Sequence, residues 1–83
     1  MNRESVKTVV VKHLVQAVDT LEASKVDTSM SMKDLGANSL DIVEVVSAAM
    51  RELKIKVPRS ELSKLTNVDQ LIDLLHRTAE QAA

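Results

Sequence analysis

The chain has no aromatic residue and no cysteine, and it has very little glycine or proline. Its 83 residues include no Phe, Trp, Tyr or Cys, and only one Gly and one Pro. Without aromatic rings there is no platform for stacked nucleobases or sugars, which argues against single-stranded nucleic-acid binding. Without cysteine there is no disulfide, thiolate metal site or cysteine nucleophile, so any thiol chemistry must be brought in from outside.

The charges are nearly balanced. Eleven Lys and Arg against twelve Asp and Glu leave a net charge of −1, too little positive charge to bind the phosphate backbone of duplex DNA. The sequence also has neither a long apolar run that could span a membrane nor the apolar core of a signal peptide. We therefore expect a cytoplasmic protein, monomeric when alone, with no nucleic-acid or membrane partner.

The scarcity of helix breakers favours an all-α fold. Apolar residues at spacings of three and four predict a first helix over 3–21, a second over 39–53 and a last helix that begins after Asn67. Residues 60–65 leave room for only a short helical segment. We predict one all-α domain over residues 1–83, a four-helix bundle with a long first loop and a short third helix.

The long connection, residues 22–37, has weak periodicity. Connections of this length in small domains are generally functional or disordered. Four apolar side chains are spaced so that they could pack over the bundle: Val26, Met30, Met32 and Leu35. We therefore expect an ordered loop and not a flexible linker.

The loop ends at the only glycine, directly before the second helix. Gly36 can take a positive φ without penalty and lets another backbone approach closely. Asn38 is a strong N-cap, and Ser39 follows in the first turn, where free N–H groups and the helix dipole favour a phosphate. The Ser39 hydroxyl is well placed for a phosphodiester, but these residues alone also fit an ordinary first-turn serine.

Catalytic and metal-binding residues do not converge in the sequence. His13 and His76 lie within the first and last predicted helices, and neither has neighbours that would complete a catalytic triad. With no Cys and two widely separated His, we predict no metal site. An enzyme would have to work with carboxylates alone.

Several motifs together resemble those of acyl carrier proteins, and the resemblance covers nearly the whole chain. The family's pattern is Asp-Leu-Gly-x-Asp-Ser-Leu, then an apolar-x-apolar-Pro segment, then a Thr-x-Val-x-x-apolar entry to the last helix. The matching segments here are Asp34-Leu35-Gly36-Ala37-Asn38-Ser39-Leu40-Asp41, Val43-Glu44, Leu53-Lys54-Ile55-Lys56-Val57-Pro58 and Leu65-Thr66-Asn67-Val68.

The resemblance implies a right-handed four-helix bundle with a phosphopantetheine arm on Ser39, attached by a separate phosphopantetheinyl transferase. Acyl groups would be attached as thioesters to the sulfur of the arm, so the chain would be a carrier and not an enzyme. It also implies that acyl-loading and acyl-accepting enzymes, such as a ketosynthase, dock on the second helix. The docking residues would be Leu40, Asp41, Val43, Glu44, Ser47, Ala48, Met50 and Arg51.

Two features depart from the family's pattern. Asn38 stands where the family usually has Asp, which preserves the cap but removes one negative charge. Family members are typically acidic along the second helix and the turn after it. The end of that region here has one acidic residue, Glu52, and four basic residues, namely Arg51, Lys54, Lys56 and Arg59. At this end of the site we therefore expect partners that do not depend on an acidic carrier surface.

The chain starts with Met1 and ends soon after its last helix, so we expect a free-standing carrier. It resembles the small carriers of polyketide gene clusters, some of which donate an acetyl group to a hydroxymethylglutaryl-synthase-like enzyme during β-branching. A carrier of fatty acid synthesis is the alternative within the family. Outside it, the alternative is a helical adaptor without a prosthetic group.

Overall fold

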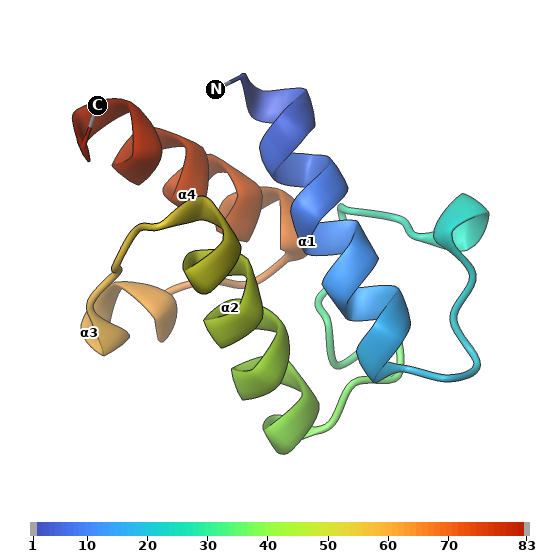
Figure 1. Ribbon diagram of the computed structural model, residues 1–83. Coiled ribbons are helices and arrows are strands. Elements are labelled where there is room, and N and C mark those ends of the chain that lie inside the picture. Colours follow the sequence, from blue (N-terminus) through green and yellow to red (C-terminus); the bar gives the residue numbers. More distant parts are fainter. Residues whose placement is uncertain (1, 83) are drawn as a thin grey trace.

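The computed structural model describes residues 2–82, and its regular elements are all helical (Figure 1). Their order is α1 (Arg3–Ala17), a short 3₁₀ turn η1 (Ala23–Lys25), α2 (Ser39–Leu53), α3 (Arg59–Leu62) and α4 (Val68–Ala82). α1 packs against both α2 and α4. The predicted all-α fold, with its long first loop and short third helix, is confirmed.

Each long helix begins at an asparagine cap. The side chains of Asn2, Asn38 and Asn67 each accept a 2.8 Å bond from the backbone N–H three residues further on. At α2 the bond is reciprocated, because the Asp41 carboxylate accepts the N–H of Asn38 at 3.2 Å to complete a capping box. These local bonds satisfy N–H groups that the helix itself leaves unpaired, and they fix where each helix starts.

α1 ends at Ala17, so the prediction that it continues to Leu21 was wrong. Val18 already has an extended backbone (φ −115°, ψ 100°). Leu21 donates its N–H to the Val18 carbonyl at 3.0 Å, which closes a turn over the polar residues 19–20. Short polar side chains favour such turns over helix. Leu21 therefore packs at the edge of the core without being helical.

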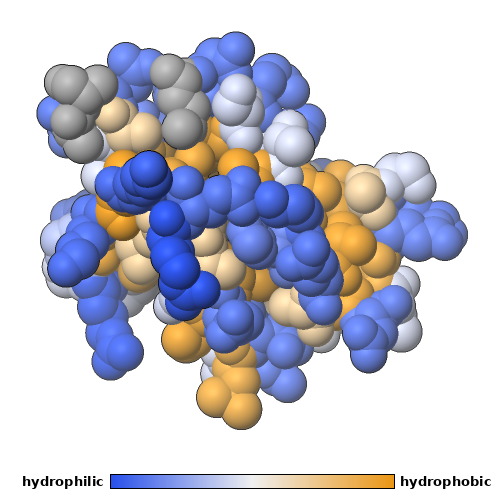
Figure 2. Space-filling model, in the orientation of Figure 1, coloured by the Kyte–Doolittle hydropathy of each residue, from blue (hydrophilic) through white to orange (hydrophobic). Residues whose placement is uncertain are grey.

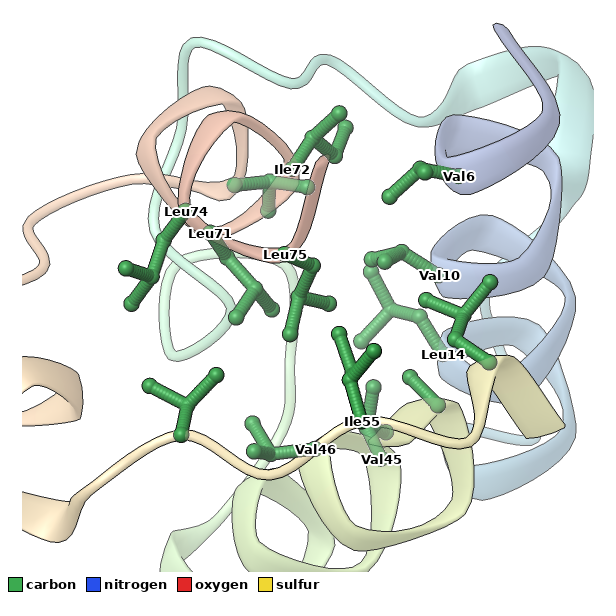
Figure 3. Packing of buried hydrophobic residues seen from close by; sticks show 14 of the residues in the cluster. Val6, Val10, Leu14, Val45, Val46, Ile55, Leu71, Ile72, Leu74 and Leu75 are labelled. Carbon is green, nitrogen blue, oxygen red and sulfur yellow. The ribbon is translucent and has the colours of Figure 1, made fainter. Parts of the chain in front are cut away.

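The core is aliphatic throughout and lies where α1, α2 and α4 meet (Figure 3). Val45, on α2, is fully buried although the sequence analysis did not single it out. The other completely buried side chains include Val6, Val10, Leu14, Val68, Leu71, Ile72 and Leu75. Aliphatic side chains at native packing density can thus fill the interior without an aromatic ring.

The long loop is ordered and is held on α4 by its backbone. The Val68 N–H donates to the Met30 carbonyl at 3.0 Å, and the Asp69 N–H donates to the Thr28 carbonyl at 2.8 Å. Three of the expected apolar side chains pack against the core as predicted, namely Val26, Met32 and Leu35. The fourth, Met30, is 37% exposed, because its backbone and not its side chain makes the attachment.

Two groups of ion pairs join α1 to its neighbours: Arg3 with Asp69 and Asp73 on α4, and Lys12 and His13 with Glu52 on α2. Lys12 and then His13 donate hydrogen bonds that lower the pKa of Glu52. The pKa of Asp69 is lowered by hydrogen bonds from Thr28 and then Arg3. Because all of these paired side chains except His13 are more than a third exposed, we expect each pair to contribute little to stability at neutral pH.

The first residues of α2 lie at the bottom of the view in Figure 1, whereas the described ends of the chain lie at the top. α1 runs toward the bottom and α2 runs back up beside it. The junction between the long loop and α2 therefore forms one tip of the molecule.

Candidate functional site

The turn before α2 depends on Gly36. Its φ is +107°, as the sequence analysis expected for a special conformation, and its N–H donates to the Lys33 carbonyl at 3.0 Å. A Cβ added to Gly36 would lie 3.3 Å from Cγ1 of Val18. The next residue, Ala37, is buried and donates its N–H to Met32. This turn positions the chain so that α2 starts two residues later.

Ser39 is the first residue of α2, and it is exposed. Within residues 2–82, no side chain or carbonyl forms a hydrogen bond with its hydroxyl. The capping box uses the N–H of Asn38 and of Asp41, which leaves first-turn N–H groups free beside the hydroxyl. This end of the helix offers an accessible oxygen nucleophile and an electrostatic environment that favours a phosphate.

The histidines do not take part in this site. His13 Nε2 lies 2.9 Å from Glu52, and His76 Nε2 lies 3.2 Å from Glu80, one turn further along α4. Neither histidine is hydrogen-bonded to Ser39. Residues 2–82 also contain no group of three His, Cys, Asp or Glu side chains that could hold a metal ion. The described residues thus place no general base at the hydroxyl.

The exposed face of α2 starts with two apolar side chains near Ser39. Leu40 is 80% exposed and Val43 is 57% exposed, and Figure 2 shows apolar side chains gathered at the lower end of the molecule, over the start of α2. Glu44 and Arg51 are exposed too, and the remaining predicted docking residues are half-buried, namely Asp41, Ser47, Ala48 and Met50. The helix thus presents a mixed apolar and charged face next to the hydroxyl.

A groove of about 650 Å³ lies beside this face, between α2, α3 and the loop. Its walls come from three separate parts of the chain: 31–33, α2 from Ile42 to Met50, and the segment 57–67. The α2 wall is largely aliphatic and includes Val43 and Val46. Sequence reasoning missed the groove, because its walls meet only in the folded structure.

Comparison with known proteins decides the family. The family model "Phosphopantetheine attachment site" matches residues 9–75, which run from α1 into α4. An acyl carrier protein of Campylobacter hominis is 41% identical over 69 residues, covering 83% of this chain and 82% of that protein. The chain belongs to the acyl carrier protein family. The prosthetic group of these carriers is phosphopantetheine, attached covalently to a serine.

Two further relatives cover most of this carrier. An acyl carrier protein of Campylobacter fetus subsp. fetus is 35% identical over 72 residues, 87% of this chain and 88% of that protein. The polyketide biosynthesis acyl-carrier-protein AcpK of Bacillus subtilis is 24% identical over 82 residues, 99% of this chain and all of that protein. Within residues 2–82 of this carrier, no helix is long and apolar enough to cross a membrane.

Proposed function

We propose that Ser39 carries the phosphopantetheine arm, and that the protein holds acyl groups as thioesters on this arm and delivers them to partner enzymes. The observation that carries the proposal is the exposed hydroxyl at the first position of α2. A phosphodiester there would sit at the positive end of the helix dipole, next to free N–H groups. The Gly36 turn supports this, because a glycine in the approach leaves room for another protein's backbone.

The arm supplies the thiol that this cysteine-free chain lacks. The chain's own residues contribute an attachment point, a rigid helix behind it and a surface for partners. Within residues 2–82 no side chain is hydrogen-bonded to the Ser39 hydroxyl to activate it. We propose that a separate phosphopantetheinyl transferase attaches the arm, and that the protein is not itself an enzyme.

Partners are proposed to dock on the exposed face of α2, through Leu40, Asp41, Val43, Glu44, Ser47, Ala48, Met50 and Arg51. Exposed apolar side chains such as Leu40 and Val43 contribute little packing to the free protein but can enter a hydrophobic pocket on a partner. Glu44, one turn from Leu40, would add a charged contact that fixes orientation. Asp41 has a second task, because its carboxylate is engaged in the capping box.

We propose a role in polyketide biosynthesis, with a ketosynthase or a hydroxymethylglutaryl-synthase-like enzyme receiving the acyl group. The support is the full-length similarity to the Bacillus subtilis carrier and the unusual basic residues after the middle of α2. A carrier of fatty acid synthesis is the second candidate. Release and mass analysis of the acyl group on protein isolated from its native cell would distinguish them, since an acetyl donor would carry mainly acetyl.

Ser39→Ala tests the attachment site. Wild-type protein coexpressed with a broad-specificity phosphopantetheinyl transferase should gain one phosphopantetheinyl group by intact mass, and the Ala variant should gain none. The variant should still fold, because Asn38 and not Ser39 caps the helix. Ser60→Ala, at another exposed first-turn serine, is the matched control and should be modified normally. Full modification of the Ser39 variant would overturn the assignment.

A further inference from the structure

Four basic side chains lie where α2 ends and α3 begins. We call them the basic cluster: Arg51, Lys54, Lys56 and Arg59. All four are exposed. No carboxylate of residues 2–82 pairs with any of them. Lys7, Lys33 and Arg77 are also unpaired among these residues but lie apart from one another in the sequence, whereas Arg3, Lys12, Lys25 and Lys64 each have a carboxylate partner. In Figure 2, strongly hydrophilic side chains cover the C-terminal part of α2.

The basic cluster is continuous with the apolar end of α2. Leu40, Glu44, Ser47 and Arg51 follow one another at spacings of four, three and four residues, so they form a single line along the exposed side of the helix. From Leu40 to Arg51 the line is about 16 Å long at 1.5 Å per residue. A partner that covers roughly 800 Å² of one protein, the usual footprint, would reach both ends of this line.

Stabilisation of α2 does not explain the whole cluster. Arg51 is in the last turn of α2, where a positive charge complements the helix dipole. Lys56 lies beyond the helix, and Arg59 is the first residue of α3, where the dipole gives a positive charge no benefit. Four unpaired like charges also repel one another, which slightly destabilises the free protein. Their joint presence is therefore better explained by an opposite charge on a partner.

We propose that the acyl-handling enzyme that receives the arm carries an acidic surface patch, set about 16 Å from the pocket that takes Leu40, which pairs with the basic cluster. The proposal rests on Ser39 being the attachment point and deepens it by naming the charge of the partner surface. The apolar start of α2 supplies affinity, and the basic cluster steers and orients the encounter. Complementary charge of this kind raises the association rate and makes it sensitive to salt.

The test measures transfer of an acetyl group from the loaded protein to the purified hydroxymethylglutaryl-synthase-like enzyme of the same organism. If that enzyme accepts no acetyl group from the wild-type protein, the ketosynthase of the same organism is used instead. Arg51→Glu/Lys54→Glu should lower kcat/KM at low ionic strength by about tenfold or more. Added salt should reduce transfer from wild type and have little effect on transfer from this variant, because two positive and two negative charges then cancel across the cluster.

Lys25→Glu/Arg77→Glu is the control, because it makes the same change in net charge with one Lys and one Arg on η1 and α4. It also removes the Lys25 contact with Glu22, but both side chains of that pair are well exposed, so its loss should cost little stability. It should transfer nearly as fast as wild type. Circular dichroism and intact mass must show that both double variants fold and are modified. Arg51→Gln/Lys54→Gln, which keeps side-chain length without charge, should fall between wild type and the reversal.

Equal loss in the two charge-reversed variants would overturn the proposal, since net charge alone would then explain it. Equal rates and equal salt dependence in wild type and Arg51→Glu/Lys54→Glu would also overturn it, while leaving the carrier function intact. If wild type transfers to neither enzyme, the proposed partners fail, and this inference fails with them. Loss of modification at Ser39 is read separately by mass and bears only on the attachment site.

Discussion

Replacing Gly36 by Ala should destabilise the fold through its backbone. At φ +107° an L-residue is strained, which costs about 1–3 kcal/mol. The new Cβ would also meet Val18 Cγ1 at 3.3 Å, a contact that requires a small shift of that side chain. Had φ been negative, the same substitution would have stabilised the protein by about 0.4–1 kcal/mol through the unfolded state. The sign of the change therefore reports the conformation of this turn.

Urea unfolding followed by circular dichroism measures the effect. With an m-value of about 1 kcal/mol/M for a small domain, the midpoint should fall by roughly 1–3 M. Gly36→Val should be worse, and should also slow modification by the transferase. Lys54→Gly is the reverse control: Lys54 has φ +59° at the end of α2, so glycine there should gain up to about 1 kcal/mol. An unchanged or raised midpoint for Gly36→Ala would refute the positive φ and its role in placing α2.

Three further effects follow from the described contacts. Asn38→Ala removes a cap and should cost about 1 kcal/mol of unfolding free energy, while Asn38→Asp should be nearly neutral; equal losses would contradict the capping box. Ile72→Ala, at a fully buried position, should cost about 2–5 kcal/mol in the same urea experiment, and a smaller loss would mean that the core collapses around the cavity. Glu52 and Asp69 have pKa values in the folded state below their ordinary values of 4.5 and 3.8. The stability that the folded protein gains from these ionised carboxylates is therefore complete at neutral pH, and it is lost as pH falls below those ordinary values. Melting curves between pH 7 and pH 3 should show this loss, and Glu52→Gln should reduce it.

Helix starts could be predicted from the sequence, but the end of α1 could not. An N-cap is a local device: Asn38 and the residue three positions on make the same bond in any context that allows the helix. The end of α1 depends on a competition between helix and turn. Val18 and Leu21 are three residues apart, a spacing that suits either, and both pack against the core once the turn has formed.

The groove and part of the core could not be predicted, because they depend on how distant segments meet. Val45 is buried because it lies on the side of α2 that faces the shared core (Figure 3), and nothing in its immediate sequence indicates this. Met30 was expected inside because it is apolar, but its carbonyl is needed by the N–H of Val68, and this leaves the side chain 37% exposed. Backbone pairing, which sequence patterns do not reveal, decided its place.

One face of α2 packs in the core, and the opposite face is exposed next to Ser39. This division explains how so small a domain can accommodate the candidate site. Val45 and Ala49 are completely buried and lie on the core face of α2, which packs against α1. Leu40 and Val43 lie on the other face, so a partner can bind them without removing anything from the core. Ser39 precedes both sets and makes no packing contact that a phosphodiester would displace, since it is exposed and the cap is provided by Asn38. The residues of α2 that stabilise the bundle and those proposed to bind partners are therefore mostly different. Asp41 and Met50 are the exceptions, since Asp41 completes the capping box and Met50 packs against the core.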